Sequence, residues 1–168
     1  MSQIELHPAQ RDELQCIENL MQFYLYELSE WLPLKLGRHG LFEIGPLLEY
    51  WREAATRPYL IRVDGELAGF ATVDDKVKLA EVQYNLAYFF VARRFRGRGI
   101  GRQVVRQLLE QLPGHWQIVH IDDNRPARDF WARIIPELTG DAYSCHPITA
   151  DGYPCTLYKF HVPTSPGR

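Results

Sequence analysis

The chain has 168 residues, of which 46% are hydrophobic and 24% charged, and its formal net charge is −2. This composition is typical of one globular domain and excludes a disordered or fibrous chain. The longest apolar run, 86–92, is far below the roughly 18 residues of a membrane-spanning helix, and residues 1–13 lack the apolar stretch of a signal peptide. We expect a single domain over 1–162, a C-terminal tail over 163–168, a cytoplasmic location and no membrane partner.

Cysteine and histidine usage bears on redox chemistry and metals. The three cysteines are an odd number without a Cys-x-x-Cys pair, so neither a disulfide framework nor a zinc ribbon is predicted. Cys145 as a nucleophile would need an activating base that the sequence does not specifically supply. His115, His120 and His146 lack paired ligand spacing on one element, so we expect structural histidines and no metal site.

The N-terminal third of the chain predicts one strand and one long helix. Residues 3–7 are typical of a short strand, and apolar residues at helical spacing predict a helix over 14–28. The pattern loses its regularity over 29–58, although 47–55 is compatible with one short helix. We interpret this part as a variable loop region.

Three strands are predicted next. The β-type runs 59–63 and 67–73 flank Asp64-Gly65, and this dipeptide is a strong hairpin signal because both turn residues tolerate positive φ. Residues 82–91 are mostly aromatic and aliphatic, and they predict a long central strand.

A helix and a parallel strand follow the central strand. Apolar positions predict a helix over 100–112, which Pro113-Gly114 ends, and then a short buried strand over 116–121. A strand, a helix and a strand in this order imply parallel pairing through a right-handed crossover.

The last part of the chain predicts one more helix and two strands. Asn124 is suited to cap a helix that ends near Pro136 or Gly140. Residues 143–146 and 156–162 are typical of strands.

The charges are distributed unevenly. Six arginines fall within fourteen residues, and no Asp or Glu lies between Glu81 and Glu110. A nucleic-acid-binding protein would be basic overall, whereas the isoelectric point here is about 6.3, so a compact polyanion is the better partner. The alternative is that Arg98, Arg102 and Arg106, spaced four apart, form one solvated helix face.

A glycine-rich loop lies within this basic segment. Residues 96–101 read RGRGIG between a predicted strand and a predicted helix. A helix N-terminus presents unpaired backbone N–H groups, and glycines let an anion approach them closely, so the loop predicts an anion site. No Gly-Lys-Ser/Thr follows, which excludes a Walker A loop, and the third glycine of a dinucleotide-binding fingerprint would fall at Arg102.

The stretch from Phe89 to Gly101, FFVARRFRGRGIG, resembles motif A of the GNAT N-acetyltransferase superfamily, whose pyrophosphate loop reads Arg/Gln-x-x-Gly-x-Gly/Ala. Arg96, Gly99 and Gly101 match its three fixed positions. Residues 124–131, NRPARDFW, resemble motif B, where an Asn and an Ala lie along the pantetheine arm. The two motifs stand at the spacing of the family, and the order of predicted elements covers most of the chain.

The resemblance implies an α/β (α+β) fold, with a mixed, mainly antiparallel sheet of six to seven strands flanked by about four helices. It also implies acetyl-CoA as cosubstrate and direct acetyl transfer to a primary amine of a small molecule or a protein, without nucleic acid. The acceptor, the acyl chain length and the oligomeric state, a homodimer included, stay open. The residues expected to hold acetyl-CoA are Phe90, Val91, Arg96, Gly97, Arg98, Gly99, Ile100, Gly101, Asn124, Ala127 and Trp131.

Direct attack needs a neutral amine, and an amine with a pKa of about 10.4 is neutral only about one part in a thousand near pH 7. A base or a chain of waters is therefore useful. Many relatives place a Glu on the fourth strand for this purpose, where this chain has Tyr84, Asn85 and Tyr88. We name Tyr88 or Glu81, acting through water, as catalytic candidates; ordinary packing or a surface charge is the alternative.

The residue at the position that protonates the leaving thiolate in many relatives also differs from the family pattern. Many relatives carry a Tyr four residues after the motif B Ala, where this chain has Trp131, whose indole N–H does not titrate usefully. Tyr143 and His146 are alternative acids. A non-catalytic module that binds or senses acyl-CoA is therefore the second functional hypothesis.

Aromatic residues around the variable region are candidates for the acceptor pocket. In the family this segment borders the substrate cleft, and core packing is the alternative for Tyr24 and Trp51. The residues are Tyr24, Tyr26, Trp31, Tyr50 and Trp51.

Overall fold

The structure is a computed structural model that describes residues 1–165. The chain divides into two compact units, residues 1–73 with 88–96, and residues 74–87 with the chain from 97 onward. Whether 1–162 behaves as the single expected domain stays a prediction. Of the expected tail, residues 163–165 have no regular secondary structure, and 166–168 lie outside the described residues.

The first unit combines three antiparallel strands with the N-terminal helices. β1 pairs with β2 and β2 with β3, and both pairs are antiparallel. Two buried residues of α1, Ile17 and Met21, pack with Trp51, Phe70 and Phe90 in one hydrophobic core. The elements are β1 (Ile4–Pro8), η1 (Arg11–Glu13), α1 (Leu14–Leu28), α2 (Gly45–Tyr50), β2 (Arg57–Val63), β3 (Glu66–Asp74) and η2 (Arg93–Phe95).

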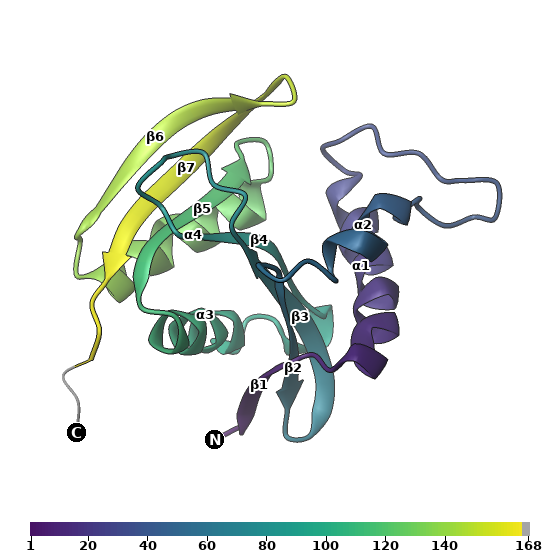
Figure 1. The fold of residues 1–168 in the computed structure, drawn as a ribbon, viewed down its shortest axis with the longest axis horizontal. Coiled ribbons are helices and arrows are strands. Elements are labelled where there is room, and N and C mark those ends of the chain that lie inside the picture. The colour runs from purple at the N-terminus through teal and green to yellow at the C-terminus, as the bar shows by residue number, and fades with distance from the viewer. Residues whose placement is uncertain (166–168) are drawn as a thin grey trace. The chain divides into compact units, whose positions relative to one another are not determined.

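The second unit contains the remaining helices and strands. β5 pairs with β7, and β7 pairs with β6, which Figure 1 shows as the green to yellow ribbons. The central strand β4 (Tyr84–Val91) begins in this unit and ends in the first. The other elements are α3 (Ile100–Gln111), β5 (Gly114–Ile121), α4 (Arg125–Thr139), β6 (Tyr143–Ala150) and β7 (Tyr153–Val162).

The strands form a seven-stranded sheet of order β1-β2-β3-β4-β5-β7-β6. Among the strand pairs whose register is defined, only β4 with β5 is parallel. These two strands are joined through α3, as the strand–helix–strand order predicted. This sheet and its helices confirm the predicted fold class. The parallel ladder covers only Tyr84–Leu86 and Trp116–Ile118, although both strands continue beyond it.

Turn chemistry decides where the strands reverse. Asp64 and Gly65 have φ of 51° and 79°, which is the two-residue hairpin turn that the sequence predicted between β2 and β3. Asp151 and Gly152 repeat it between β6 and β7, with φ of 51° and 83°. Gly140, with φ of 59°, ends α4, so of the two predicted ends the later one is correct.

The segment between α1 and α2 is less irregular than expected. The Gln22 side chain accepts from the Phe42 backbone N–H at 2.8 Å and donates to the Phe42 carbonyl at 2.9 Å. An antiparallel bridge joins Leu36 to Phe42. The helix predicted at 47–55 lies instead at Gly45–Tyr50, so its predicted second half was wrong. No helix of the described chain has both the length and the apolar character needed to cross a membrane.

Candidate functional site

The glycine loop leads into the N-terminus of α3. Gly97 and Gly99 have φ of 73° and 75°, in the left-handed region that favours glycine, and Gly99 is the N-cap residue. Among the residues that the structure describes, no side chain caps the helix, and its first turn carries no acid. Within the described chain, a Cβ atom added at Gly97 or Gly99 would meet no atom within 4 Å. The loop therefore exposes helix N–H groups to open space, which suits an anion.

The Arg96 side chain is hydrogen-bonded to other residues of the first unit. Its Nε donates to the Val91 carbonyl at 2.6 Å, and Nη2 donates to a Glu27 carboxylate oxygen at 2.8 Å. Its guanidinium carbon lies 5.6 Å from the centre of the Phe90 ring. Contact between Arg96 and a pyrophosphate stays a prediction. The structure gives this arginine a second role, because it ties the end of β4 to α1.

Acidic residues from distant parts of the chain compensate much of the arginine cluster. Glu27 also accepts from Arg93 Nε at 3.0 Å, and Glu66 of β3 pairs with Arg94 at 2.6 Å. In the second unit Arg102 pairs with Glu137 of α4. Backbone N–H groups, rather than bare positive charge, are therefore the main feature of the loop that favours an anion.

Glu27 should make the stability of the protein depend on pH. Partial burial alone would raise its pKa, but hydrogen bonds from Arg96 and Arg93 outweigh burial and lower the pKa overall. A lowered carboxyl pKa contributes stability above the unfolded-state pKa, and this stability is lost as pH falls through the folded-state pKa. We expect Glu27→Gln to lower the free energy of unfolding near pH 7 and to have a smaller effect near pH 4.

Urea unfolding at both pH values checks this expectation. The matched control is Glu66→Gln, which removes the more exposed pair with Arg94 and should have the smaller effect, because exposed ion pairs contribute little. Equal losses for Glu27→Gln at both pH values would contradict the expectation.

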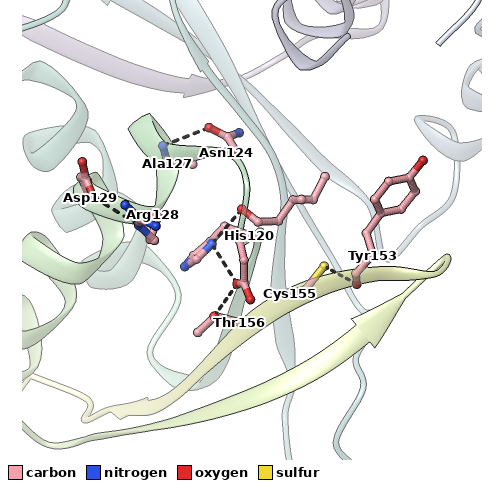
Figure 2. Close-up of polar contacts among 10 residues, drawn as sticks. His120, Asn124, Ala127, Arg128, Asp129, Tyr153, Cys155 and Thr156 are labelled. Atoms are coloured by element: carbon pink, nitrogen blue, oxygen red, sulfur yellow. Dashed lines mark hydrogen bonds and ion pairs between the residues drawn. The ribbon is translucent and has the colours of Figure 1, made fainter. Parts of the chain in front are cut away.

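Motif B forms the start of α4. The Asn124 side chain accepts from the Ala127 backbone N–H at 3.1 Å, so Asn124 is the N-cap that the sequence predicted (Figure 2). Trp131, on the second turn of the same helix, is only 6% exposed. Next to this helix start, Asp122 accepts from Thr156 at 2.7 Å. The cofactor roles of Asn124, Ala127 and Trp131 stay predictions.

The two catalytic candidates have different surroundings. Glu81 pairs with Lys159, and the hydrogen bond from this lysine lowers the pKa of Glu81, which makes the carboxylate a weaker base. Tyr88 lies between the rings of Tyr24 and Tyr50, with centroid distances of 5.6 and 6.0 Å. Glu81 belongs to the second unit and Tyr88 to the first.

The remaining aromatic and acid candidates are more scattered. His146 is exposed and bonds to Ser144 at 2.8 Å, and Tyr143 is 37% exposed. Of the residues considered for an acceptor pocket, Tyr26 is 70% exposed, whereas Trp51 is buried in the core.

Sequence reasoning missed a buried polar chain in the second unit. Asp74, only 3% exposed, accepts from the Asn85 amide at 2.9 Å, and Asn85 accepts from Gln117 at 3.0 Å. Gln117 in turn accepts from the Lys78 backbone N–H at 2.8 Å. The sequence offered one signal for this feature, which is that the apolar run of β3 ends in an acid, Asp74. This row of hydrogen-bonded side chains places the Asp74 carboxylate beside β4, a strand that carries no carboxylate of its own.

Comparisons with known proteins agree with this architecture. The sequence matches the model of the Acetyltransferase (GNAT) family over residues 20–135, which is more than half of the chain. No curated protein sequence matches it significantly.

Solved structures share the fold at low sequence identity. An acetyltransferase from Thermus thermophilus superposes with a TM-score of 0.68 at 16% identity, covering 95% of this chain and 97% of that one. A spermidine N-acetyltransferase from Vibrio cholerae, in complex with CoA and spermine, gives 0.65 at 12% identity and coverages of 95% and 96%. Arabidopsis thaliana NAA60 with a bisubstrate analogue gives 0.62 at 15% identity and coverages of 97% and 100%. These structures show the fold, and the match of the family model over residues 20–135 shows that the chain belongs to the GNAT acetyltransferase family.

Proposed function

We propose that the protein is an N-acetyltransferase that moves the acetyl group of acetyl-CoA to a primary amine by direct attack. The observation that carries this proposal is the uncapped N-terminus of α3, where Gly97 and Gly99 both adopt left-handed conformations. The loop offers helix N–H groups and no acid, the chemistry that a pyrophosphate requires. Family membership supports acetyl-CoA as the source of that pyrophosphate.

Residues expected to bind acetyl-CoA occur in both units of the chain. In the second unit, the N–H groups of 97–101 would hold the pyrophosphate, and the start of α4, from Asn124 to Trp131, would lie along the pantetheine arm. In the first unit, Phe90 and Val91 would present strand backbone to the same arm.

The transfer is balanced without a covalent enzyme intermediate. The ammonium group first loses a proton to a base or to water, and the nitrogen lone pair then forms a bond to the thioester carbonyl carbon. The nitrogen loses a second proton to a base or to water as the amide forms. The carbon–sulfur bond then breaks, and the sulfur leaves as a thiolate. Because an ordinary thiol has a pKa of about 8.5, the thiolate can leave without strong acid assistance, so a buried Trp131 is compatible with turnover.

Two of the structural neighbours were solved with bound ligands. The Vibrio cholerae protein is a spermidine N-acetyltransferase crystallised with CoA and spermine, and the Arabidopsis thaliana protein holds a bisubstrate analogue. They share only 12% and 15% identity with this chain, so the similarity concerns the fold and supports no particular substrate.

Release of free CoA from acetyl-CoA, measured with a panel of primary amines, tests the proposal. We expect amine-dependent release by the wild type and none by Gly99→Glu, which blocks the glycine loop. The panel should include polyamines, arylalkylamines and peptides with a free N-terminus or a lysine. Binding of acetyl-CoA without release with any amine would refute the enzyme proposal and favour the non-catalytic acyl-CoA-binding module.

A further inference from the structure

Two histidines of the second unit stand opposite each other on neighbouring strands. His115 lies on β5 and His161 on β7, and the register of this antiparallel pair places them directly across from each other. The centres of their rings are 4.5 Å apart, and the ring planes are tilted by 41°. His161 is exposed and His115 is half-buried, so solvent reaches the pair. Residue spacing within one element does not reveal such a pair, because the two histidines come from different strands.

Backbone hydrogen bonds explain why the two rings are so close. The His115 N–H donates to the Gln83 side chain at 2.9 Å, and the His115 carbonyl accepts from the Gln83 backbone N–H at 2.9 Å. Both backbone groups of His115 therefore point away from β7, so His115 and His161 form a non-hydrogen-bonded pair. In pairs of this kind the side chains of two antiparallel strands come closest together. The sheet backbone itself thus sets the short distance between the rings.

The separation of the rings fits one metal ion that is bound by a nitrogen of each ring. Metal–nitrogen bonds to imidazole are about 2.0–2.1 Å long, so a shared ion separates the two ring centres by roughly 4.5–5 Å. The observed distance of 4.5 Å agrees with this range. Imidazole nitrogen suits Zn²⁺, Ni²⁺ and Cu²⁺, whereas Mg²⁺ and Ca²⁺ prefer oxygen ligands. The pair therefore favours a transition-metal ion.

A carboxylate near the pair compensates the closest lysine. Glu81 accepts a hydrogen bond from Lys159, which stands two residues before His161 on β7. The pKa of Glu81 is lowered first by this hydrogen bond and in smaller part by the charge of a protonated His115, so the carboxylate lies near the histidines. Because Glu81 offsets the lysine charge, Lys159 opposes a cation at the pair only weakly.

Open space adjoins the more exposed histidine. His161 lines a cavity of about 370 Å³ whose charged lining also includes one guanidinium and two carboxylates, from Arg106, Glu110 and Glu137. The cavity leaves room for water on a bound ion. The described residues include no group of three or more His, Cys, Asp and Glu side chains that could hold a metal, so water would complete the coordination.

We propose that His115 and His161 form a binding site for one divalent transition-metal ion of the Zn²⁺, Ni²⁺ and Cu²⁺ class, with one nitrogen of each ring and water as its ligands. A bound ion links β5 to β7 and stabilises the folded chain, because the unfolded chain does not hold the two rings together. The site is independent of the proposed acetyl transfer, since neither histidine is among the residues expected to bind acetyl-CoA or to act in the transfer.

Calorimetric titration of the full chain, free of any histidine tag, tests the site with Ni²⁺, Zn²⁺ and Mg²⁺, each added alone. We expect one Ni²⁺ or Zn²⁺ ion per chain and no binding of Mg²⁺. The affinity for Ni²⁺ should fall on acidification from near pH 7.5 to near pH 5.5, because protonated imidazole does not bind a metal. A site made of carboxylates would keep its affinity over this range, since ordinary carboxyl groups stay ionised there.

Matched variants assign the binding to the pair. His161→Phe and His115→Phe each keep a ring at the position and remove its metal-binding nitrogens, so each should weaken Ni²⁺ binding by at least about ten-fold. The rise in Tm that Ni²⁺ gives to the wild type should be lost in both variants. The controls are His146→Ala and Cys145→Ser, which remove exposed side chains of β6 that could bind a metal by themselves. Both controls should keep the wild-type affinity.

The outcomes decide the proposal without reference to acetyl-CoA. Wild-type Ni²⁺ affinity in His161→Phe overturns it, and His115→Phe provides the same test if the first variant fails to fold. Loss of binding in His146→Ala or Cys145→Ser would place the metal on β6 and also overturn it. Binding of Mg²⁺ as tight as that of Ni²⁺ would assign the ion to carboxylates instead of the histidine pair.

Discussion

Replacing Gly99 by glutamate is expected to abolish the stabilisation that acetyl-CoA gives to the wild-type protein. The substitution places a negative side chain in the open space above the N-terminus of α3, where the cofactor phosphates are proposed to bind. At about 100 times its dissociation constant, a ligand adds roughly 2.7 kcal/mol to stability. For a chain of this size this corresponds to a rise of about 5–10 °C in Tm. Thermal unfolding with and without acetyl-CoA measures both effects.

The control for this variant is Gly152→Glu in the β6–β7 turn. Gly99 and Gly152 have similar positive φ, 75° and 83°, and a Cβ atom added at either would meet open space, so each variant costs about 1–2 kcal/mol of backbone strain. A negative charge at a helix N-terminus is favourable for the helix itself, so it adds no further instability. Only the Gly99 variant should lose the acetyl-CoA shift. A full shift in Gly99→Glu would place the cofactor elsewhere, and no shift in the wild type would remove the proposed cofactor.

Gly69→Ala is expected to destabilise the protein by more than about 3 kcal/mol or to prevent folding. A Cβ atom at this position of β3 would lie 2.0 Å from the Phe90 carbonyl oxygen and 3.1 Å from the Val91 Cα. Both obstacles are backbone atoms of the neighbouring strand, so no side-chain rotation relieves the clash. The affected residues are also those whose backbone is expected to contact pantetheine, so a variant that folds should bind acetyl-CoA more weakly.

Urea unfolding of the purified variant measures the loss of stability. Gly45→Ala is the matched control, because its added methyl group would meet no described atom within 4 Å and its φ is not in the positive range. This control should be neutral or slightly stabilising, since alanine restricts the unfolded chain. Wild-type stability of Gly69→Ala would mean that the two strands do not approach each other as closely as the structure has them.

Local patterns predicted most of the elements because they depend on local physics. The helix at 14–28 and the Asp64-Gly65 hairpin depend on spacing and on turn geometry, and both form as predicted. Asn124 likewise caps its helix through contacts within its own first turn. The segment 29–44 was harder to predict, because the Gln22 side chain that organises it comes from an earlier helix.

Charge was the least predictable property of the site. In the sequence, the arginine-rich segment is strongly positive because no acid lies near it. In the folded chain Glu27 and Glu66 approach its arginines from α1 and β3, and Asp74 approaches Asn85 from the end of β3. Contacts of this kind join residues far apart in sequence, and no local spacing encodes them.

The sequence by itself determined the order of the elements and the family, because the glycine loop and the second motif are continuous segments whose backbone chemistry is local. The tertiary structure alone decided which side chains face one another: Arg96 with Glu27, Asp74 with Asn85, and Tyr88 with Tyr24 and Tyr50. Each of these pairs comes from different elements. Their contact depends on sheet order and helix packing, which the whole chain sets together.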